Sequence, residues 1–239
     1  MNKNIISLSG GKDSTAMLFL MIERNEPIHS VVYCDMGEWE FPEMRMHIEK
    51  LRSIITVPFV RVYPKYELTY MLTKKPIMKN GKVYRYGYNW PTAIRRWCTR
   101  EKISAINRYL KKLSCDFTVC IGYVSDEQKR IKPNAQKKYR YPLIEYGVNN
   151  TLQYCYENGF SYNGLYKIFD RVSCFCCPLQ RIGELRKLRK NRPKLWCKML
   201  EWDSKIDTQF GVGFKGYKTV LDMDKRFREE DRQLSFFND

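Results

Sequence analysis

A string of six residues near the start of the chain, Ser9-Gly10-Gly11-Lys12-Asp13-Ser14, has the composition of a phosphate-binding loop. Two adjacent glycines let the backbone turn tightly and bring its N–H groups close to an anion. A helix directly after the turn would add unpaired N–H donors and a partial positive charge. Ser9 and Ser14 supply hydroxyl donors and Lys12 supplies a cation, while Asp13 suits either Mg²⁺ binding or helix capping. The spacing is too short for the Walker pattern, and the alternative is an ordinary glycine-rich turn.

The segments around this string alternate between strand and helix periods. Short apolar runs predict strands at residues 4–8, 31–34 and 57–62, and apolar residues at helical spacing predict helices at 14–23 and 42–55. This alternation favours parallel strands joined by right-handed crossovers. We therefore expect an α/β fold with a doubly wound, Rossmann-like parallel sheet. Residues 117–121 are expected to add a strand, and residues 141–144 are a candidate for another.

Length, charge and hydropathy narrow the class of protein. The 239 residues divide most simply into a nucleotide-binding α/β domain over residues 1–170 and a basic, cysteine-containing helical extension over residues 171–239. A formal charge of +17, from 43 Lys or Arg and 26 Asp or Glu, favours a polyanionic partner such as RNA or DNA. No apolar stretch approaches the roughly 20 residues that span a bilayer, and the first residues lack a signal-peptide pattern. We expect a cytoplasmic protein with no membrane partner.

The glycine-rich string resembles the signature of the PP-loop ATP pyrophosphatases, which cleave ATP between the α- and β-phosphates and adenylate a substrate. Five further segments resemble the PAPS-reductase-like branch of that family. They are Cys34-Asp35-Met36-Gly37-Glu38-Trp39-Glu40-Phe41-Pro42-Glu43, Arg95-Arg96-Trp97-Cys98-Thr99-Arg100-Glu101-Lys102, Gly122-Tyr123-Val124-Ser125-Asp126-Glu127-Gln128-Lys129-Arg130, Tyr141-Pro142-Leu143-Ile144-Glu145 and Cys174-Phe175-Cys176-Cys177-Pro178.

The resemblance implies roles for individual residues. ATP phosphates would be bound by the string together with Gly122, and Asp35 would lie near the nucleotide or Mg²⁺. Asp13, Lys102, Arg130 and Cys98 would be the catalytic residues, of which Lys102 and Arg130 would counter the charge that develops on the leaving pyrophosphate.

One departure from the family bears on the reaction. True sulfonucleotide reductases attack sulfur with the cysteine of a C-terminal Glu-Cys-Gly-Leu-His segment. Residues 227–239 contain no cysteine, and that segment occurs nowhere else in the chain. The chain therefore lacks the nucleophile that PAPS reduction needs. We keep a PAPS or APS reductase only as an alternative to the adenylating enzyme described below.

The cysteines predict thiol or metal chemistry rather than disulfides. Nine is an odd number, and a reduced compartment disfavours a disulfide framework. Cys174 and Cys177 have the spacing of two ligands to one metal, Cys98 lies in a segment that resembles the family's active-site face, and Cys197 is available as a fourth ligand. Three alternatives stay open: a 4Fe–4S cluster with one open iron, a structural Zn²⁺ site, or no metal, with a cysteine as persulfide carrier or without a chemical role.

Two basic runs and one aromatic segment favour nucleic acid over other polyanions. The runs are residues 181–194 and the set Lys129, Arg130, Lys132, Lys137, Lys138 and Arg140. Tyr84, Tyr86, Tyr88 and Trp90 alternate with Lys82 and Arg85, an arrangement that can stack bases beside their phosphates. The alternative for each run is a solvated helix face, with the aromatic rings packed in the core.

We expect an enzyme that uses ATP and Mg²⁺ to adenylate an acceptor, a nucleic acid or a smaller molecule, and then replaces oxygen with sulfur from a donor protein. The main alternative is a non-enzymatic subunit that binds nucleotide and nucleic acid around a structural metal. Release of AMP and pyrophosphate separates the two hypotheses.

Overall fold

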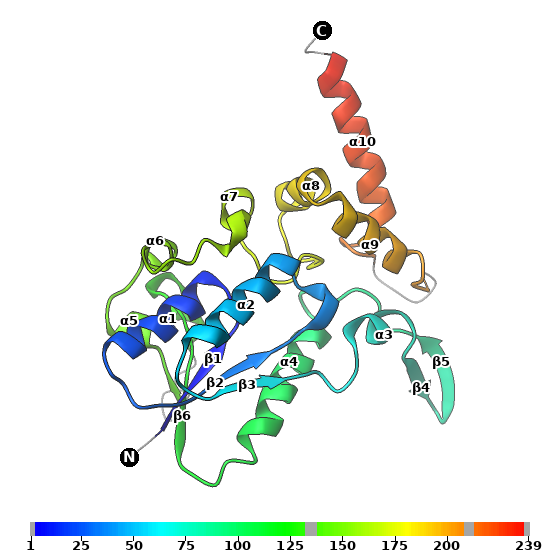
Figure 1. Cartoon of the computed structure of the whole chain (residues 1–239). Coiled ribbons are helices and arrows are strands. Elements are labelled where there is room, and N and C mark those ends of the chain that lie inside the picture. The colour runs from blue at the N-terminus through cyan, green and yellow to red at the C-terminus, as the bar shows by residue number, and fades with distance from the viewer. Residues whose placement is uncertain (1–2, 132–137, 208–212, 237–239) are drawn as a thin grey trace. The chain divides into compact units, whose positions relative to one another are not determined.

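The computed structural model describes residues 3–131, 138–207 and 213–236, and within them the main sheet has five parallel strands (Figure 1). Their order is β3-β2-β1-β6-β7, formed by Phe59–Val62, Ile28–Cys34, Lys3–Leu8, Phe117–Cys120 and Tyr139–Arg140. The chain runs outward from β1 through β2 to β3 and then returns to the other side of β1 as β6. This reversal is the mark of a doubly wound sheet, so the expected α/β fold is confirmed.

Helices cover both faces of this sheet. Figure 1 shows α1 (Lys12–Glu23) and α2 (Pro42–Ile54) on one face and α4 (Trp97–Leu110) on the other. Ile5, Val32 and Val119 from three adjacent strands pack against Leu110 of α4 as one buried cluster. The three central strands, β2, β1 and β6, are largely buried on both faces, which explains why their sequences read as continuous apolar runs rather than as an alternation.

The prediction of a strand at residues 141–144 is wrong. Residues Pro142–Glu145 form a short helix, α5, with Pro142 in its first turn, and the strand lies just before it as β7. Tyr139 and Arg140 pair with Val119 and Cys120 of β6. Proline fixes a helical φ and has no N–H to donate to a neighbouring strand. Strand β7 therefore ends before Pro142, and a helix follows.

The connections on the α1 side of the sheet consist of short helices. After α5 come α6 (Thr151–Glu157), the 3-10 turn η4 (Tyr162–Gly164) and α7 (Leu165–Ile168). Two further 3-10 turns follow strand ends, η1 (Gly37–Trp39) after β2 and η2 (Ser125–Arg130) after β6. Helix α6 packs closely on α1, so residues about 140 positions apart in the sequence lie side by side.

The chain forms two compact units. The first consists of Met1–Pro64, Lys102–Lys167 and Arg171–Ser173, and it contains the parallel sheet. The second consists of Lys65–Glu101, Ile168–Asp170 and Cys174–Asp239, with α3 (Leu68–Thr73), β4 (Pro76–Lys79), β5 (Lys82–Tyr86), α8 (Ile182–Asn191), α9 (Pro193–Asp203) and α10 (Val220–Phe236).

In the second unit, residues 65–101 pack with the C-terminal helices. The indole N–H of Trp90 donates to Asp203 Oδ1 at 2.7 Å, and its ring meets Phe214 edge-on at 4.9 Å. Asp203 also accepts from the backbone N–H of Val220, which joins α9 to the start of α10. Within the described residues no helix is both long and apolar enough to cross a membrane.

Candidate functional site

The phosphate loop (residues 9–14) turns between the end of β1 and the start of α1. Gly10 has φ +80°, and a Cβ at this position would lie 2.9 Å from Ile48 Cδ1 of α2. Gly11 is the N-cap residue of α1 and forms no side-chain cap. A left-handed turn pressed against a helix requires glycine at residue 10, and an uncapped helix start leaves backbone N–H groups directed into the loop. The tight turn inferred from the sequence is therefore present.

The loop lies where the order of the strands reverses. Leu8 at the end of β1 pairs with Tyr33 of β2 on one side, and β6 is the neighbour on the other side. Gly122, which follows β6, approaches the start of α1 so closely that a Cβ would lie 2.8 Å from the carbonyl oxygen of Asp13. Ligands of open α/β sheets bind outside the carboxyl ends of the strands at this reversal. Gly122 and the phosphate loop therefore meet at the edge where a nucleotide is expected.

The two serines of the loop hold its conformation. The hydroxyls of Ser9 and Ser14 share a hydrogen bond of 2.9 Å, and the Ser14 hydroxyl also donates to the carbonyl of Gly11 at 3.1 Å. The backbone N–H of Ser9 donates to the oxygen of the same hydroxyl at 3.1 Å. Ser14 is buried, so its hydroxyl serves the loop itself in this state.

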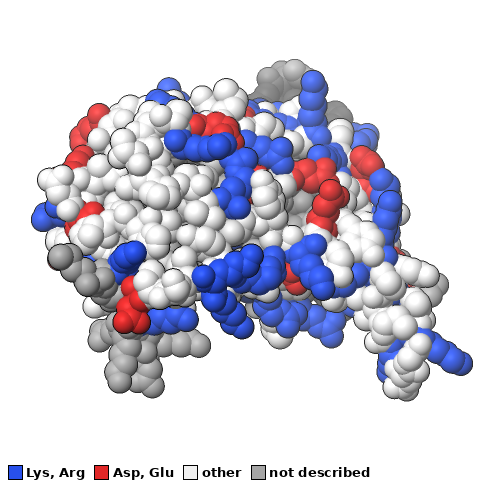
Figure 2. Space-filling view, turned by 60° about the horizontal axis from the view of Figure 1, so that its bottom comes forward, with Lys and Arg blue, Asp and Glu red and all other residues white. Residues whose placement is uncertain are grey.

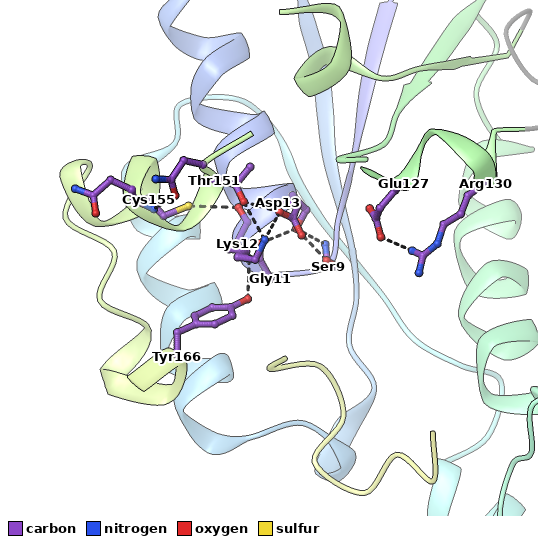
Figure 3. Close-up of polar contacts among 12 residues, drawn as sticks. Ser9, Gly11, Lys12, Asp13, Glu127, Arg130, Thr151, Cys155 and Tyr166 are labelled. Carbon is purple, nitrogen blue, oxygen red and sulfur yellow. Dashed lines mark hydrogen bonds and ion pairs between the residues drawn. The ribbon is translucent and has the colours of Figure 1, made fainter. Parts of the chain in front are cut away.

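Lys12 and Asp13 form an ion pair that a residue from α6 completes (Figure 3). Lys12 Nζ lies 2.7 Å from Asp13 Oδ1, and about a third of each side chain is exposed. The hydroxyl of Thr151 donates to the same carboxylate oxygen at 2.5 Å and accepts from Lys12 Nζ at 3.1 Å. Thr151 is 1% exposed, so packing holds its hydroxyl in place. Three side chains thus set the position of one carboxylate and one ammonium group at the helix start.

A tyrosine and a cysteine contact the backbone of the same loop residue. The hydroxyl of Tyr166 in α7 accepts from the backbone N–H of Lys12 at 2.9 Å, and the thiol of Cys155 in α6 donates to the Lys12 carbonyl at 3.3 Å. Burial raises the pKa of the Tyr166 hydroxyl and that of the Cys155 thiol, the latter to about 11. Both groups are therefore protonated at neutral pH. Tyr166 occupies an N–H that an incoming phosphate oxygen would otherwise take.

Sequence reasoning missed Thr151, Cys155 and Tyr166. Asn150 caps α6 by accepting from the backbone N–H of Gln153 at 3.4 Å, and an asparagine followed by threonine is a recognisable helix start. That signal identifies the helix but not its partner, because nothing in residues 150–166 points to a loop some 140 residues earlier.

Asp35 and Lys102 lie at the end of β2. Asp35 Oδ1 accepts from the backbone N–H of Gly37 at 2.8 Å, and Asp35 Oδ2 lies 3.8 Å from a guanidinium nitrogen of Arg61. Burial raises the pKa of Glu40, and the charge of Lys102 acts in the opposite direction on that carboxyl. Lys102 also lowers the pKa of Cys34, which burial raises to about 11. The ammonium group of Lys102 is therefore close to the carboxyl end of β2.

Arg130 is exposed and paired within its own turn. Its guanidinium forms an ion pair with Glu127 across η2 and lies 5.8 Å from the centre of the Tyr123 ring. Figure 3 shows this pair apart from the group formed by Lys12, Asp13 and Thr151. In this state the charge of Arg130 is directed to Glu127 rather than to the phosphate loop.

Several members of the basic runs are held in ion pairs. Arg140 bridges Glu26 and Glu145, each at 2.6 Å, while Arg189 of α8 pairs with Asp224 at 2.9 Å and Asp231 at 2.6 Å. Lys132 and Lys137 lie outside the described residues. For these arginines the alternative of a structural role fits better than phosphate binding.

The cysteine cluster belongs to the second unit. Cys98, Cys174 and Cys177 are partly buried, Cys176 is fully buried and Cys197 is exposed on α9. Burial, and next the charge of Cys177, raises the pKa of Cys98. Burial likewise raises the pKa of Cys176, with smaller effects from Cys174 and Cys177. Thiols at positions 98, 174, 176 and 177 are therefore close enough to influence one another.

A 4Fe–4S cluster, a structural Zn²⁺ site and no metal are the three alternatives that the sequence leaves open for these cysteines. Across the described ranges, no three or more His, Cys, Asp or Glu side chains are arranged to hold a metal ion. Of the four cysteines expected as ligands, Cys197 differs from the others because it lies exposed on α9. We therefore derive no step of the reaction through iron or zinc.

Comparison with known proteins agrees with this arrangement. A family model described as the phosphoadenosine phosphosulfate reductase domain matches residues 3–180. Two proteins of Methanocaldococcus jannaschii, both described as uncharacterized, are 28% and 26% identical to the chain over 204 and 220 residues. These matches cover 80% and 84% of the chain but only 39% and 48% of the two archaeal proteins. The nin region protein ORF290 of Escherichia phage lambda, also described as uncharacterized, is 21% identical over 98% of the chain and 88% of its own length.

Proposed function

Because the chain belongs to the phosphoadenosine phosphosulfate reductase domain family, within the PP-loop superfamily, we propose that it binds ATP at residues 9–14 and cleaves it to AMP and pyrophosphate. The observation that carries the proposal is the Lys12–Asp13–Thr151 arrangement at the start of α1. It holds a cation and a carboxylate beside the backbone N–H groups of the loop, where the charge of a leaving pyrophosphate would develop. Fixed donors and charges at such a point are a main source of rate enhancement.

In the proposed reaction an oxygen of the acceptor attacks the α-phosphorus of ATP. The bond from that phosphorus to the α,β-bridging oxygen breaks, and pyrophosphate leaves with the bonding electrons. The loop N–H groups and Lys12 bind the leaving group, and the acceptor keeps the adenylyl group. Positioning of the two reactants supplies much of the remaining acceleration.

Asp13 is the residue that would hold Mg²⁺. The ion commonly takes one or two carboxylates together with phosphate oxygens and water, and a partly exposed carboxylate at the phosphate loop fits that donor set. Bound there, Mg²⁺ would neutralise charge on the phosphates. Asp13 would then exchange its bond to Lys12 for the metal and leave the ammonium group free for the pyrophosphate.

We further propose that a nucleic acid, RNA or DNA, is the acceptor and that sulfur from a donor protein replaces the adenylated oxygen. A sulfide equivalent would attack the activated carbon, and the oxygen would leave on AMP. The formal charge of +17 supports the acceptor class. The neighbouring Cys98 and Cys177 support thiol chemistry.

The test is the formation of AMP and pyrophosphate from labelled ATP and Mg²⁺ with RNA, DNA or small acceptors, together with the exchange of pyrophosphate into ATP. We expect both activities in the wild type and their loss in Asp13→Ala, with Asp116→Ala before β6 as an exposed carboxylate control that keeps them. ATP binding without AMP formation under every acceptor would contradict the proposal.

One observation favours a second function, that of a nucleotide sensor without turnover. The Tyr166 hydroxyl already occupies the backbone N–H of Lys12, so nucleotide binding would displace a tyrosine and alter α7. A sensor would bind ATP tightly and release it unchanged, so the same assay separates the two functions.

A further inference from the structure

We propose that the hairpin β4–β5 is a binding surface for single-stranded nucleic acid, through stacking of bases on Tyr84 and Tyr86 and contact of phosphates with the lysines around them. The inference deepens the proposed function by giving the acceptor a place on the molecule. It rests on residues of the second unit alone.

The side chains of the hairpin are largely exposed, and its pairing shifts register between Ile77 and Met78. Its strands pair antiparallel, with Pro76 opposite Tyr86 and Lys79 opposite Lys82. Asn80 and Gly81 connect them, with φ of 51° and 76°, as the two-residue turn of a tight hairpin requires. Figure 1 shows the two strands beside α3, and they form a two-stranded sheet of their own. Two strands alone are marginally stable in water, so this exposed element gains from a partner.

The base of the hairpin is anchored to α3. The backbone N–H of Gly87 donates to the carbonyl of Lys75 at 2.8 Å, and the backbone N–H of Tyr88 donates to the carbonyl of Met71 at 2.8 Å. A Cβ at Gly87 would lie 2.2 Å from the carbonyl oxygen of Leu72. These contacts fix the base of the hairpin against α3, so the backbone that carries its exposed side chains is held in place.

The exposed side chains of the hairpin combine rings with cations. Tyr84 is 46% and Tyr86 57% exposed, with Met78 and Val83 also exposed. The Lys79 ammonium lies 5.1 Å from the centre of the Tyr84 ring, and Lys75 lies 4.7 Å from the ring of Tyr66. Large exposed apolar groups mark interaction sites, and rings beside ammonium groups suit a partner with both bases and phosphates.

Charge selects a polyanion as the occupant. Between Leu68 and Arg100 the sequence has eight Lys or Arg and no Asp or Glu. Figure 2 shows more Lys and Arg than Asp and Glu side chains on the face turned toward the viewer. An acidic protein could satisfy the lysines, but it would not use exposed tyrosine rings as stacking platforms. Single-stranded nucleic acid uses both, because its bases are unpaired.

The structure also limits which aromatic residues take part. Trp90 is 3% exposed and bonded to Asp203, and the Tyr88 ring packs 5.7 Å from Trp97. Of the four rings that alternate with cations in the sequence, Tyr84 and Tyr86 are the most exposed, at 46% and 57%. The surface is therefore narrower than the sequence pattern indicates.

The test measures the binding of labelled oligothymidylate and oligouridylate by fluorescence anisotropy over a range of salt, without ATP. We expect Tyr84→Ala/Tyr86→Ala to weaken binding about tenfold or more, since stacking contributes on the order of a tenfold factor per base. Tyr84→Phe/Tyr86→Phe keeps both rings and should bind as the wild type does. Tyr217→Ala, which removes a tyrosine 94% exposed elsewhere in the same unit, is the matched control and should also bind normally.

A second pair of variants tests the cations. Lys79→Ala/Lys82→Ala should reduce the slope of log affinity against log salt by about 1.4, because each phosphate contact on a single strand contributes roughly 0.7. Lys111→Ala/Lys112→Ala removes the same charge from exposed positions after α4 and should leave the slope unchanged.

The outcomes separate this inference from the proposed function. Unchanged affinity in Tyr84→Ala/Tyr86→Ala, equal binding of duplex and single strand, or a wild type that binds only an acidic protein would overturn the inference. So would sedimentation showing that the hairpin joins two copies of the chain. Asp13→Ala should bind oligonucleotide normally while losing AMP formation, so failure of catalysis leaves the binding result intact. The tyrosine variants should in turn keep their affinity for ATP.

Discussion

The hydroxyl of Tyr166 lies 2.9 Å from the backbone nitrogen of Lys12 and accepts its hydrogen bond. A donor that a phosphate would use is thus satisfied by the protein before any ligand arrives. If nucleotide binds at this loop as proposed, its phosphate would replace the tyrosine hydroxyl as the acceptor. Binding affinity would then depend on a residue of α7 as well as on the loop.

Tyr166→Phe should remove the acceptor of the Lys12 backbone N–H in the free protein. Pyrophosphate would then form the bond to Lys12 without displacing a hydroxyl, so we expect several-fold tighter binding, in line with about 1 kcal/mol per net hydrogen bond. The free variant should be less stable by about 1–3 kcal/mol, because a shielded N–H loses its partner. Isothermal titration with pyrophosphate and urea unfolding measure the two effects. Weaker binding would show instead that the hydroxyl donates to the phosphate.

Thr151→Val should disturb the pair of charged residues at the loop while preserving volume. The variant removes the hydroxyl that links Lys12 Nζ to Asp13 Oδ1, so both side chains gain freedom. We expect about a tenfold loss of AMP formation, since a hydrogen bond to a charged group contributes roughly 1.5–3 kcal/mol. Thr151→Ser retains the hydroxyl and should retain most of the rate. Equal rates in the serine and valine variants would remove Thr151 from the site.

Gly122→Ala should destabilise the contact between the loop after β6 and the start of α1. The added Cβ would lie 2.8 Å from a backbone oxygen, which cannot move as a flexible side chain can. We expect a loss of about 1–3 kcal/mol in the free energy of unfolding, together with weaker ATP binding. Gly183→Ala in α8 meets nothing within 4 Å and should stabilise its helix by up to about 1 kcal/mol. Equal stability of the two variants would contradict the close approach.

His47 should make stability depend on pH. Burial lowers the pKa of its imidazole from 6.5 to about 4, and its Nε2 lies 3.2 Å from the Thr15 hydroxyl in α1. The unfolded chain therefore binds a proton at higher pH than the folded protein does. The free energy of unfolding should be unaffected by this group above pH 6.5 and should fall between 6.5 and 4 by about 3 kcal/mol at most.

The matched variants for this dependence are His47→Gln and His29→Gln. The first lacks the buried imidazole and should lose the fall between pH 6.5 and 4, while the second keeps His47 and should retain it. Urea unfolding followed by circular dichroism at several pH values measures it. An identical profile in His47→Gln and the wild type would assign the dependence to other groups.

The sequence by itself determined the glycine turn at residues 9–14 and the class of fold. Two glycines followed by lysine, aspartate and serine specify a tight turn and a helix start through neighbouring residues alone, and the apolar runs specify strands through burial on both faces. Local patterns of this kind also located the helices after β1 and β2. The same patterns placed a strand at residues 141–144 instead of at Tyr139–Arg140, because Pro142 was taken as part of the strand.

Only the tertiary structure decided which side chains complete the loop and which basic or aromatic residues remain available. Thr151 and Tyr166 reach Lys12 across about 140 residues, Arg140 is held between Glu26 and Glu145, and Trp90 is buried against Phe214. Residue type and spacing report what a side chain can do. Its partners depend on the packing of distant segments, which no local period encodes.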